Sequence, residues 1–409
     1  MAILKHFGRK IHFFGVFFVL FLLACGGEVP AEKRSKTTEK PTIIRTGAEQ
    51  TTKYLPQLRG KRVGLLVNQT SRIGDRHLVD TLYQLGMDIT RIFAPEHGFR
   101  GEADAGAQIA DGRDVTTGAP LISLYGDKKK PSSSDLADLD ILVFDIQDVG
   151  ARFYTYISTM SYAMEACAEN GVPFMVLDRP NPNGHFVDGP VLDPAYSSFV
   201  GMHPVPVVHG MTVGEYARMV NGEGWLQNGV QCDLTVIPCA NYTHDTPYQL
   251  PVKPSPNLPN MRAMYLYPSL CFLEPTVVSV GRGTDKQFQV IGMPGSPVGD
   301  YTFTPRPGPG AQYPKHQEVD CTGFDLTDQP PREIWQQERI DLSYLLRMYK
   351  AAPDQEAFFT SPSFFDKLAG GPDLRNRIEA GQTAAEIRDS WSPGLAAFRQ
   401  KRKGYLLYP

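Results

Sequence analysis

The chain has 409 residues, of which 42% are hydrophobic and 21% are charged, and its formal net charge at pH 7 is −3. This composition describes an ordinary globular protein whose length allows two domains. Because the charge balance gives no basic surface, nucleic acid is not expected as a partner.

The first 24 residues have the pattern of a secretory signal peptide. Basic residues precede an apolar run over residues 11–24, which is too short for an ordinary membrane span. The run ends in LLACG, which resembles the lipobox of bacterial lipoproteins, so we expect cleavage before Cys25 and a lipid on its thiol. Residues 25–41 are polar and predict a flexible tether. The protein is therefore expected in the cell envelope, as a membrane-anchored lipoprotein of the periplasm or the outer membrane.

Residues 42–204 alternate between predicted strands and helices. Four apolar runs predict buried strands that each end in hydrogen-bonding residues, at 61–67, 87–93, 139–145 and 173–177. Asp75 is expected to cap the first intervening helix and Gly86 to end it, and Gly171 is expected to end a later helix. Residues 102–135 predict a long loop with a short apolar piece. This alternation predicts an α/β fold with a doubly wound parallel sheet covered by helices.

Residues 205–409 are expected to form a second, smaller α/β domain. Thr212 and Glu215 predict a capping box, residues 232–238 a strand, and the proline-rich residues 251–259 an extended loop. Two short apolar segments then present Glu274 and Arg282. The tail after Arg332 predicts helices, the last interrupted by Pro393, and a terminal strand over residues 405–408.

Motifs for several common chemistries are missing from the sequence. The turn after the first strand lacks the glycine fingerprint of nucleotide-binding folds, and there is no Walker-type loop. No Gly-x-Ser-x-Gly elbow and no His-Glu-x-x-His pair occurs. The five cysteines after Cys25 are scattered, without a disulfide framework or zinc-site spacing. We therefore expect neither a cofactor nor a metal.

Carboxylates remain as the candidates for proton-transfer chemistry, and Glu96 is the first choice. It follows Pro95 at a strand end, where a glutamate is not needed for packing. The alternative is that Glu96 is an ordinary surface residue without a function. Two carboxylates across a cleft are the arrangement that glycoside hydrolysis needs. The candidate partners are acidic residues at other strand ends or in the second domain: Asp145, Asp148, Asp178 and Glu274.

Several long motifs in register resemble the DUF1343 family, whose characterised members are exo-β-N-acetylmuramidases of the NamZ type. They are residues 66–70 (LVNQT), 93–101 (FAPEHGFRG), 145–156 (DIQDVGARFYTY), 178–182 (DRPNP), 279–284 (SVGRGT) and 405–408 (YLLY). The resemblance covers the chain from about residue 42 to its end. It implies a Rossmann-like domain joined to a smaller C-terminal domain across a cleft. It also implies an enzyme that removes N-acetylmuramic acid from the non-reducing end of peptidoglycan fragments.

The resemblance also implies roles for individual residues. Glu96 becomes the general acid or base, with Asp145 or Glu274 as the second catalytic group. Residues that line the cleft are expected to bind substrate, and they are Asn68, His97, Gln147, Asp148, Arg152, Tyr154, Asp178 and Arg282. Family members commonly read Glu-Gly-Thr-Asn where this chain has EPTV at 274–277, and the proline predicts a different aim for Glu274.

The expected substrate suits these residue types. N-acetylmuramic acid carries a lactyl carboxylate, which an arginine can hold with two parallel hydrogen bonds, so Arg152 and Arg282 are candidate anchors. A structural ion pair is the alternative for each. Tyr154 offers a flat face for the sugar. A non-catalytic lipoprotein that binds cell-wall sugars or another small ligand is the alternative function, and no protein partner is predicted.

Overall fold

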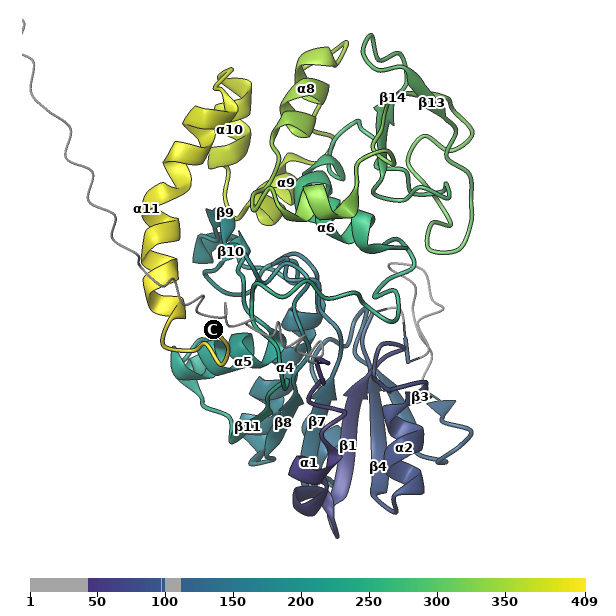
Figure 1. Cartoon of the computed structure of the whole chain (residues 1–409), viewed down its shortest axis with the longest axis vertical. Helices are drawn as coiled ribbons and strands as arrows, with labels where there is room; N and C mark the ends of the chain where they lie inside the picture. Colours follow the sequence, from purple (N-terminus) through teal and green to yellow (C-terminus); the bar gives the residue numbers. More distant parts are fainter. Residues whose placement is uncertain (1–42, 97, 100–111) are drawn as a thin grey trace, which may run out of the picture. The chain divides into compact units, whose positions relative to one another are not determined.

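A seven-stranded sheet is the central element of the described chain, which comprises residues 43–96, 98–99 and 112–409 of a computed structural model (Figure 1). Neighbouring strands are parallel except for the antiparallel pair β5–β6 at one edge. In spatial order the strands are β11 (Leu234–Ile237), β8 (Phe174–Leu177), β7 (Ile141–Asp145), β1 (Arg62–Val67), β4 (Asp88–Ala94), β6 (Pro120–Ser123) and β5 (Gly112–Arg113). The expected parallel α/β sheet is confirmed. The expectations for Cys25, His97 and residues 1–41 lie outside the described residues.

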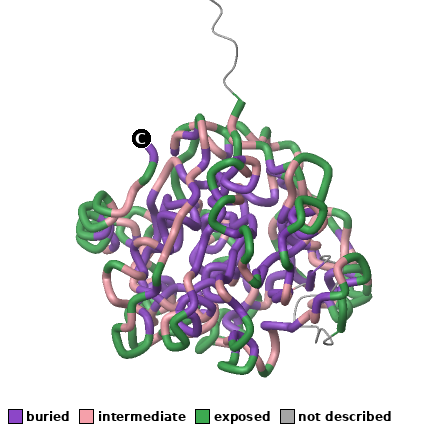
Figure 2. Tube along the Cα trace, turned by 90° about the horizontal axis from the view of Figure 1, so that it is seen from below, coloured by how far each residue is buried: buried purple, intermediate pink, exposed green. Residues whose placement is uncertain are grey.

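The strands are apolar on both faces because helices cover both faces. Leu66 and Phe144 point into one hydrophobic cluster, while their neighbours Leu65 and Val143 point into a second cluster on the opposite face. Helices α1 (Thr51–Leu58) and α2 (Leu78–Gln84) pack on the second cluster. Helices α4 (Tyr156–Asn170) and α5 (Val213–Gly222) pack on the first. Figure 2 shows the buried residues gathered in the interior of the fold.

Helix α4 ends where its sequence predicts, whereas α2 starts later than expected. Gly171 follows α4 in the left-handed conformation, with φ of 67°. A two-stranded hairpin of β2 (Arg72–Ile73) and β3 (Arg76–His77) precedes α2. His77 caps α2, since its side chain accepts a hydrogen bond from Val79 N. Asp75 lies in the hairpin turn and therefore does not cap the helix.

The sheet does not end at the domain boundary expected between residues 204 and 205. Strand β11 pairs in parallel with β8, and helix α5, opened by the predicted capping box of Thr212 and Glu215, packs against both strands. The physical reason is that β8 would otherwise be an exposed sheet edge. Strand β11 therefore belongs to the same sheet as the strands that precede residue 204.

The other helices and strands lie outside the seven-stranded sheet. A three-stranded antiparallel sheet has the order β12 (Val290–Met293), β14 (Cys321–Asp325) and β13 (Tyr301–Phe303), and β9 (Asp188–Val191) pairs with β10 (Pro206–Val208). The remaining α-helices are α3 (Ser133–Leu136), α6 (Met261–Leu270), α7 (Pro331–Trp335), α8 (Ser343–Ala351), α9 (Pro362–Ala369), α10 (Asp373–Glu379) and α11 (Ala384–Arg402). Short 3₁₀ helices are η1 (Pro194–Tyr196), η2 (Gln227–Gly229) and η3 (Cys271–Leu273).

Two expectations for the C-terminal tail were wrong. Helix α11 continues through Pro393, because one missing backbone bond is offset by the burial of Ile387, Trp391, Leu395 and Phe398 in the first cluster. Residues 405–408 form no strand, since Leu407 N donates to the Glu215 carboxylate and not to a neighbouring strand. Among residues 43–96, 98–99 and 112–409, no helix combines the length and apolar character that a membrane crossing requires.

Candidate functional site

A cavity at the carboxyl end of the parallel sheet brings together several of the predicted residues. Its water-accessible volume is about 140 Å³, so it is smaller than the pockets that enclose drug-sized ligands. Glu96 enters it from the turn after β4, and residues 153–156 enter from the loop between β7 and α4. Another part of the lining contains Glu274 and Arg282, which follow α6 and η3. Glu96, Tyr154, Glu274 and Arg282 thus line the same cavity.

Glu96 is held by the start of helix α4. Thr155 Oγ1 donates a hydrogen bond of 2.9 Å to Glu96 Oε2. Thr155 is the N-cap residue of α4, yet its hydroxyl makes no capping bond to the helix backbone. Its hydroxyl binds Glu96 instead of capping the helix. Glu96 therefore lies near the positive end of a helix, partly exposed and oriented by a neutral donor.

Glu274 and Arg282 form an ion pair in the cavity lining. Arg282 Nε and a terminal nitrogen donate to the two Glu274 oxygens at 2.5 and 3.1 Å. The arginine also lies over the Phe288 ring, 5.3 Å from its centroid. Burial alone would lower the pKa of Arg282, but the Glu274 carboxylate outweighs burial and raises it. The predicted lactyl anchor Arg282 is thus already engaged by a protein carboxylate.

A half-buried lysine fixes the backbone that carries Glu274. Lys315 Nζ donates to the carbonyl oxygens of Glu274 (2.6 Å), Thr276 and Val278 (3.1 Å). Burial lowers the pKa of Lys315 to about 8. The adjacent His316 donates to the Val277 carbonyl oxygen at 2.6 Å. With these bonds, the segment that contains Pro275 still directs Glu274 into the cavity.

Aromatic side chains form one part of the cavity wall. Tyr154 packs edge-on against Tyr156 and Tyr267, with ring centroids 4.9 and 5.9 Å apart. The Tyr156 hydroxyl donates to the Pro254 carbonyl oxygen, whereas the Tyr154 hydroxyl has no partner among the described residues. Tyr154 therefore offers both a ring and an uncommitted hydroxyl.

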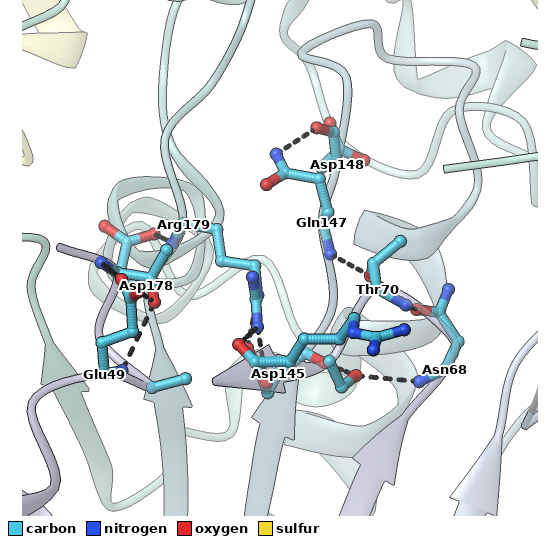
Figure 3. Close-up of polar contacts among 12 residues, drawn as sticks. Glu49, Asn68, Thr70, Asp145, Gln147, Asp148, Asp178 and Arg179 are labelled. Carbon is cyan, nitrogen blue, oxygen red and sulfur yellow. Dashed lines mark hydrogen bonds and ion pairs between the residues drawn. The ribbon is translucent and has the colours of Figure 1, made fainter. Parts of the chain in front are cut away.

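The structure gives Asp145 and Asp178 structural partners away from the cavity. Asp145 is completely buried and accepts two hydrogen bonds from Arg179, at 2.5 and 2.9 Å (Figure 3). Asp178 accepts from Thr212 Oγ1, Gly214 N and Tyr408 Oη, which ties β8 to the start of α5 and to the C-terminus. Burial raises the pKa of Asp178 to about 6. Asp145 is therefore not a partner of Glu96 in the structure, because the buried Arg179 binds the Asp145 carboxylate.

Asn68, Gln147 and Asp148 form a buried network between strand ends (Figure 3). Thr70 Oγ1 donates to Asn68 Oδ1 at 2.6 Å and accepts from Gln147 N at 2.9 Å. Asp148 accepts from Gly150 N at 2.6 Å, and burial raises its pKa to about 7. These side chains do not line the cavity; they hold the loops that do.

Arg152 is a structural residue and not the expected carboxylate anchor. Its side chain is fully buried and donates to the carbonyl oxygens of Pro190, Val205 and Leu368, at 2.7 to 2.8 Å. Burial lowers its pKa to about 9. These bonds join β9, the chain before β10, and α9, and Arg152 does not line the cavity.

Sequence reasoning missed several polar residues of the cavity. Ser255 and Asn257 come from the proline-rich segment that was interpreted only as an extended loop, and Thr155 was overlooked beside its aromatic neighbours. The usable signal was the alternation of serine and asparagine with prolines, which holds polar side chains on a stiff backbone. The described residues contain no group of histidine, cysteine and carboxylate side chains that would hold a metal ion.

Comparison with known proteins gives consistent matches along the chain. Residues 63–262 match the N-terminal model of exo-beta-N-acetylmuramidase NamZ, and residues 265–408 match its C-terminal model. The peptidoglycan beta-N-acetylmuramidase NamZ of Bacillus subtilis (strain 168) is 40% identical over 404 residues, which cover 92% of this chain and 94% of that protein.

Two solved structures of DUF1343 family proteins from Bacteroides fragilis NCTC 9343 have the same fold. One is 48% identical with a TM-score of 0.83, and the other is 31% identical with a TM-score of 0.73. In each case the match covers 90% of this chain and 99% of the other. The chain therefore belongs to the exo-beta-N-acetylmuramidase NamZ family, also called DUF1343.

Proposed function

We propose that the protein is a glycoside hydrolase that removes N-acetylmuramic acid from the non-reducing end of peptidoglycan fragments. Family membership and 40% identity to a peptidoglycan beta-N-acetylmuramidase support this activity. The single structural observation that carries it is that Glu96 and Glu274 line the same cavity from different elements. Two carboxylates flanking a sugar site are what hydrolysis of a glycosidic bond requires.

The two glutamates take different roles because their partners differ. Glu96 has a neutral partner, the Thr155 hydroxyl, so it is free to exchange a proton with the departing sugar oxygen. Glu274 is bonded to Arg282 and acts as the second carboxylate, at the face where water or the enzyme attacks the anomeric carbon. The bond from the anomeric carbon to the leaving oxygen breaks, that oxygen gains a proton, and water supplies the new hydroxyl.

A disaccharide assay tests this proposal. Purified protein is incubated with MurNAc-GlcNAc, and released MurNAc is measured by chromatography. We expect Glu96→Gln to lower kcat by roughly 100-fold or more, since general acid–base catalysis contributes about 10²- to 10⁴-fold. Glu356→Gln, an exposed loop position, is the matched control and retains wild-type activity.

The outcomes separate the enzyme from the alternative function. Full activity in Glu96→Gln would remove Glu96 from the mechanism. If wild-type protein binds the disaccharide but releases no MurNAc, the protein is a non-catalytic sugar-binding lipoprotein.

We also propose that the protein is anchored to a membrane of the cell envelope through a lipid on Cys25. The support is the basic start, the short apolar run and the LLACG sequence at residues 22–26. Membrane fractionation and mass spectrometry of the N-terminal peptide test this. A diacylglyceryl adduct on Cys25, and its loss together with membrane association in Cys25→Ser, is the expected result; an unmodified, soluble wild type would contradict it.

A further inference from the structure

Asn257 presents a buried, oriented and unpaired carbonyl oxygen at the cavity. Its side chain is 2% exposed and belongs to the proline-rich segment that lines the site. Asn257 Nδ2 donates to the Gly310 carbonyl oxygen at 2.7 Å. That bond fixes the orientation of the amide, because a carbonyl oxygen accepts only from the nitrogen end. Asn257 Oδ1 has no donor among the described residues.

An unpaired buried amide oxygen is costly, and folded proteins rarely retain one without a reason. In this case the local backbone is stiff, since Pro254, Pro256 and Pro259 surround the residue, and Asn257 N bonds the Ser255 hydroxyl at 3.3 Å. The oxygen therefore cannot turn away to find another partner. A ligand group that donates a hydrogen bond satisfies it once the side chains around the oxygen move apart, because the oxygen itself is buried.

We propose that Asn257 Oδ1 accepts the N–H of the 2-acetamido group on the sugar that the enzyme releases. This inference rests on the proposed muramidase function and extends it to substrate recognition. An amide N–H can only donate and an amide oxygen can only accept, so the two groups are matched. The apolar side chains of Val200, Leu258 and Leu368, which line the same cavity, suit the acetyl methyl group.

A pair of substrates that differ in one atom tests the assignment. The first is MurNAc-GlcNAc, and the second carries a 2-acetoxy group on the muramyl residue, in which the N–H is replaced by an ester oxygen. Wild-type kcat/KM should be roughly 10- to 100-fold lower for the ester, because a site built to bond a donor rejects the analogue that lacks it. Asn257→Leu removes the acceptor and keeps a side chain of similar volume. The kcat/KM values of this variant for the two substrates should therefore differ by no more than about 3-fold.

Tyr154→Phe is the matched control from the same cavity. It should lower kcat/KM for both substrates by similar factors and keep the wild-type preference for the acetamido sugar. A preference ratio does not depend on the amount of active enzyme, so a partly unstable variant remains informative. If Asn257→Leu does not fold, Asn257→Ala gives the same comparison.

Each outcome bears on one claim. If the Asn257 variants keep the wild-type preference ratio, or if the wild type does not distinguish the two substrates, the assignment of Asn257 is wrong. If the wild type releases the terminal sugar from neither substrate, the proposed function fails instead. Loss of the preference in the Asn257 variants alone supports the assignment.

Discussion

At the scale of single residues, Thr155 connects helix capping to catalysis. Its hydroxyl donates to Glu96 although it occupies the capping position of α4. We expect Thr155→Val to lower kcat/KM by roughly 10-fold, since a hydrogen bond to a charged group contributes about 1.5–3 kcal/mol. Melting temperature should change little, because no capping bond is lost. Thr155→Ser keeps the hydroxyl and should retain activity; equal loss in both variants would contradict this role.

Asp148 should make stability depend on pH. Burial raises the pKa of its carboxyl from 3.8 in the unfolded chain to about 7 in the folded one. Between these values the folded state binds more protons, so stability falls as pH rises from about 4 to 7, by at most about 1.4 kcal/mol per pH unit. Urea unfolding at pH 5 and pH 8 checks this. The wild type should lose roughly 2 kcal/mol relative to Asp148→Asn over that interval, and parallel curves would refute the assignment.

At the scale of elements, the segment after η3 depends on a cation from a distant loop. Its backbone forms no strand, apart from an isolated bridge between Ser279 and Gly292, so its carbonyl oxygens need other donors. Lys315 supplies three of those bonds and His316 a fourth. The loop between β13 and β14 thereby determines where Glu274 lies in the cavity.

Lys315→Met should therefore affect both stability and turnover. Three carbonyl oxygens lose their donor, which we expect to cost about 3 kcal/mol of unfolding free energy at roughly 1 kcal/mol per bond. Because Glu274 moves with its backbone, kcat should fall by more than the folded fraction explains. Urea unfolding and MurNAc release measure the two effects. Lys315→Arg, which retains a cation, is the control and should be affected less. Unchanged kcat in Lys315→Met would show that the bonds from Lys315 to the three carbonyl oxygens are not needed for turnover.

At the scale of the whole molecule, the two halves of the sequence share one hydrophobic core. The larger cluster includes Leu66 of β1 and Phe398 of α11, and β11 completes the sheet from beyond residue 204. We expect residues 43–409 to unfold in a single cooperative transition, with circular dichroism and tryptophan fluorescence coinciding. A fragment of residues 43–204 lacks β11 and α5 and should show no cooperative transition. Independent folding of that fragment would contradict the shared core.

Local sequence patterns determined much of the fold. The runs that became β1, β4, β7 and β8 are uniformly apolar because both faces of a parallel strand are covered, and Gly171 marked the end of α4. Family motifs contain Glu96, Tyr154 and Arg282, and these three residues line the cavity together with Glu274. All of these predictions depend only on a residue and its neighbours in the sequence.

Only the tertiary structure separated cavity residues from structural ones. Asp145 and Glu96 both follow strands in the sequence, but Arg179 pairs with the first and Thr155 with the second. Arg152 looks like an anion-binding residue until three backbone carbonyls are found around it, and Asn257 looks like part of a linker. The physical reason is that partners and burial are set by residues far away in the chain. The sequence alone thus indicated four strands of the sheet and the family, while folding decided which polar groups were left without partners.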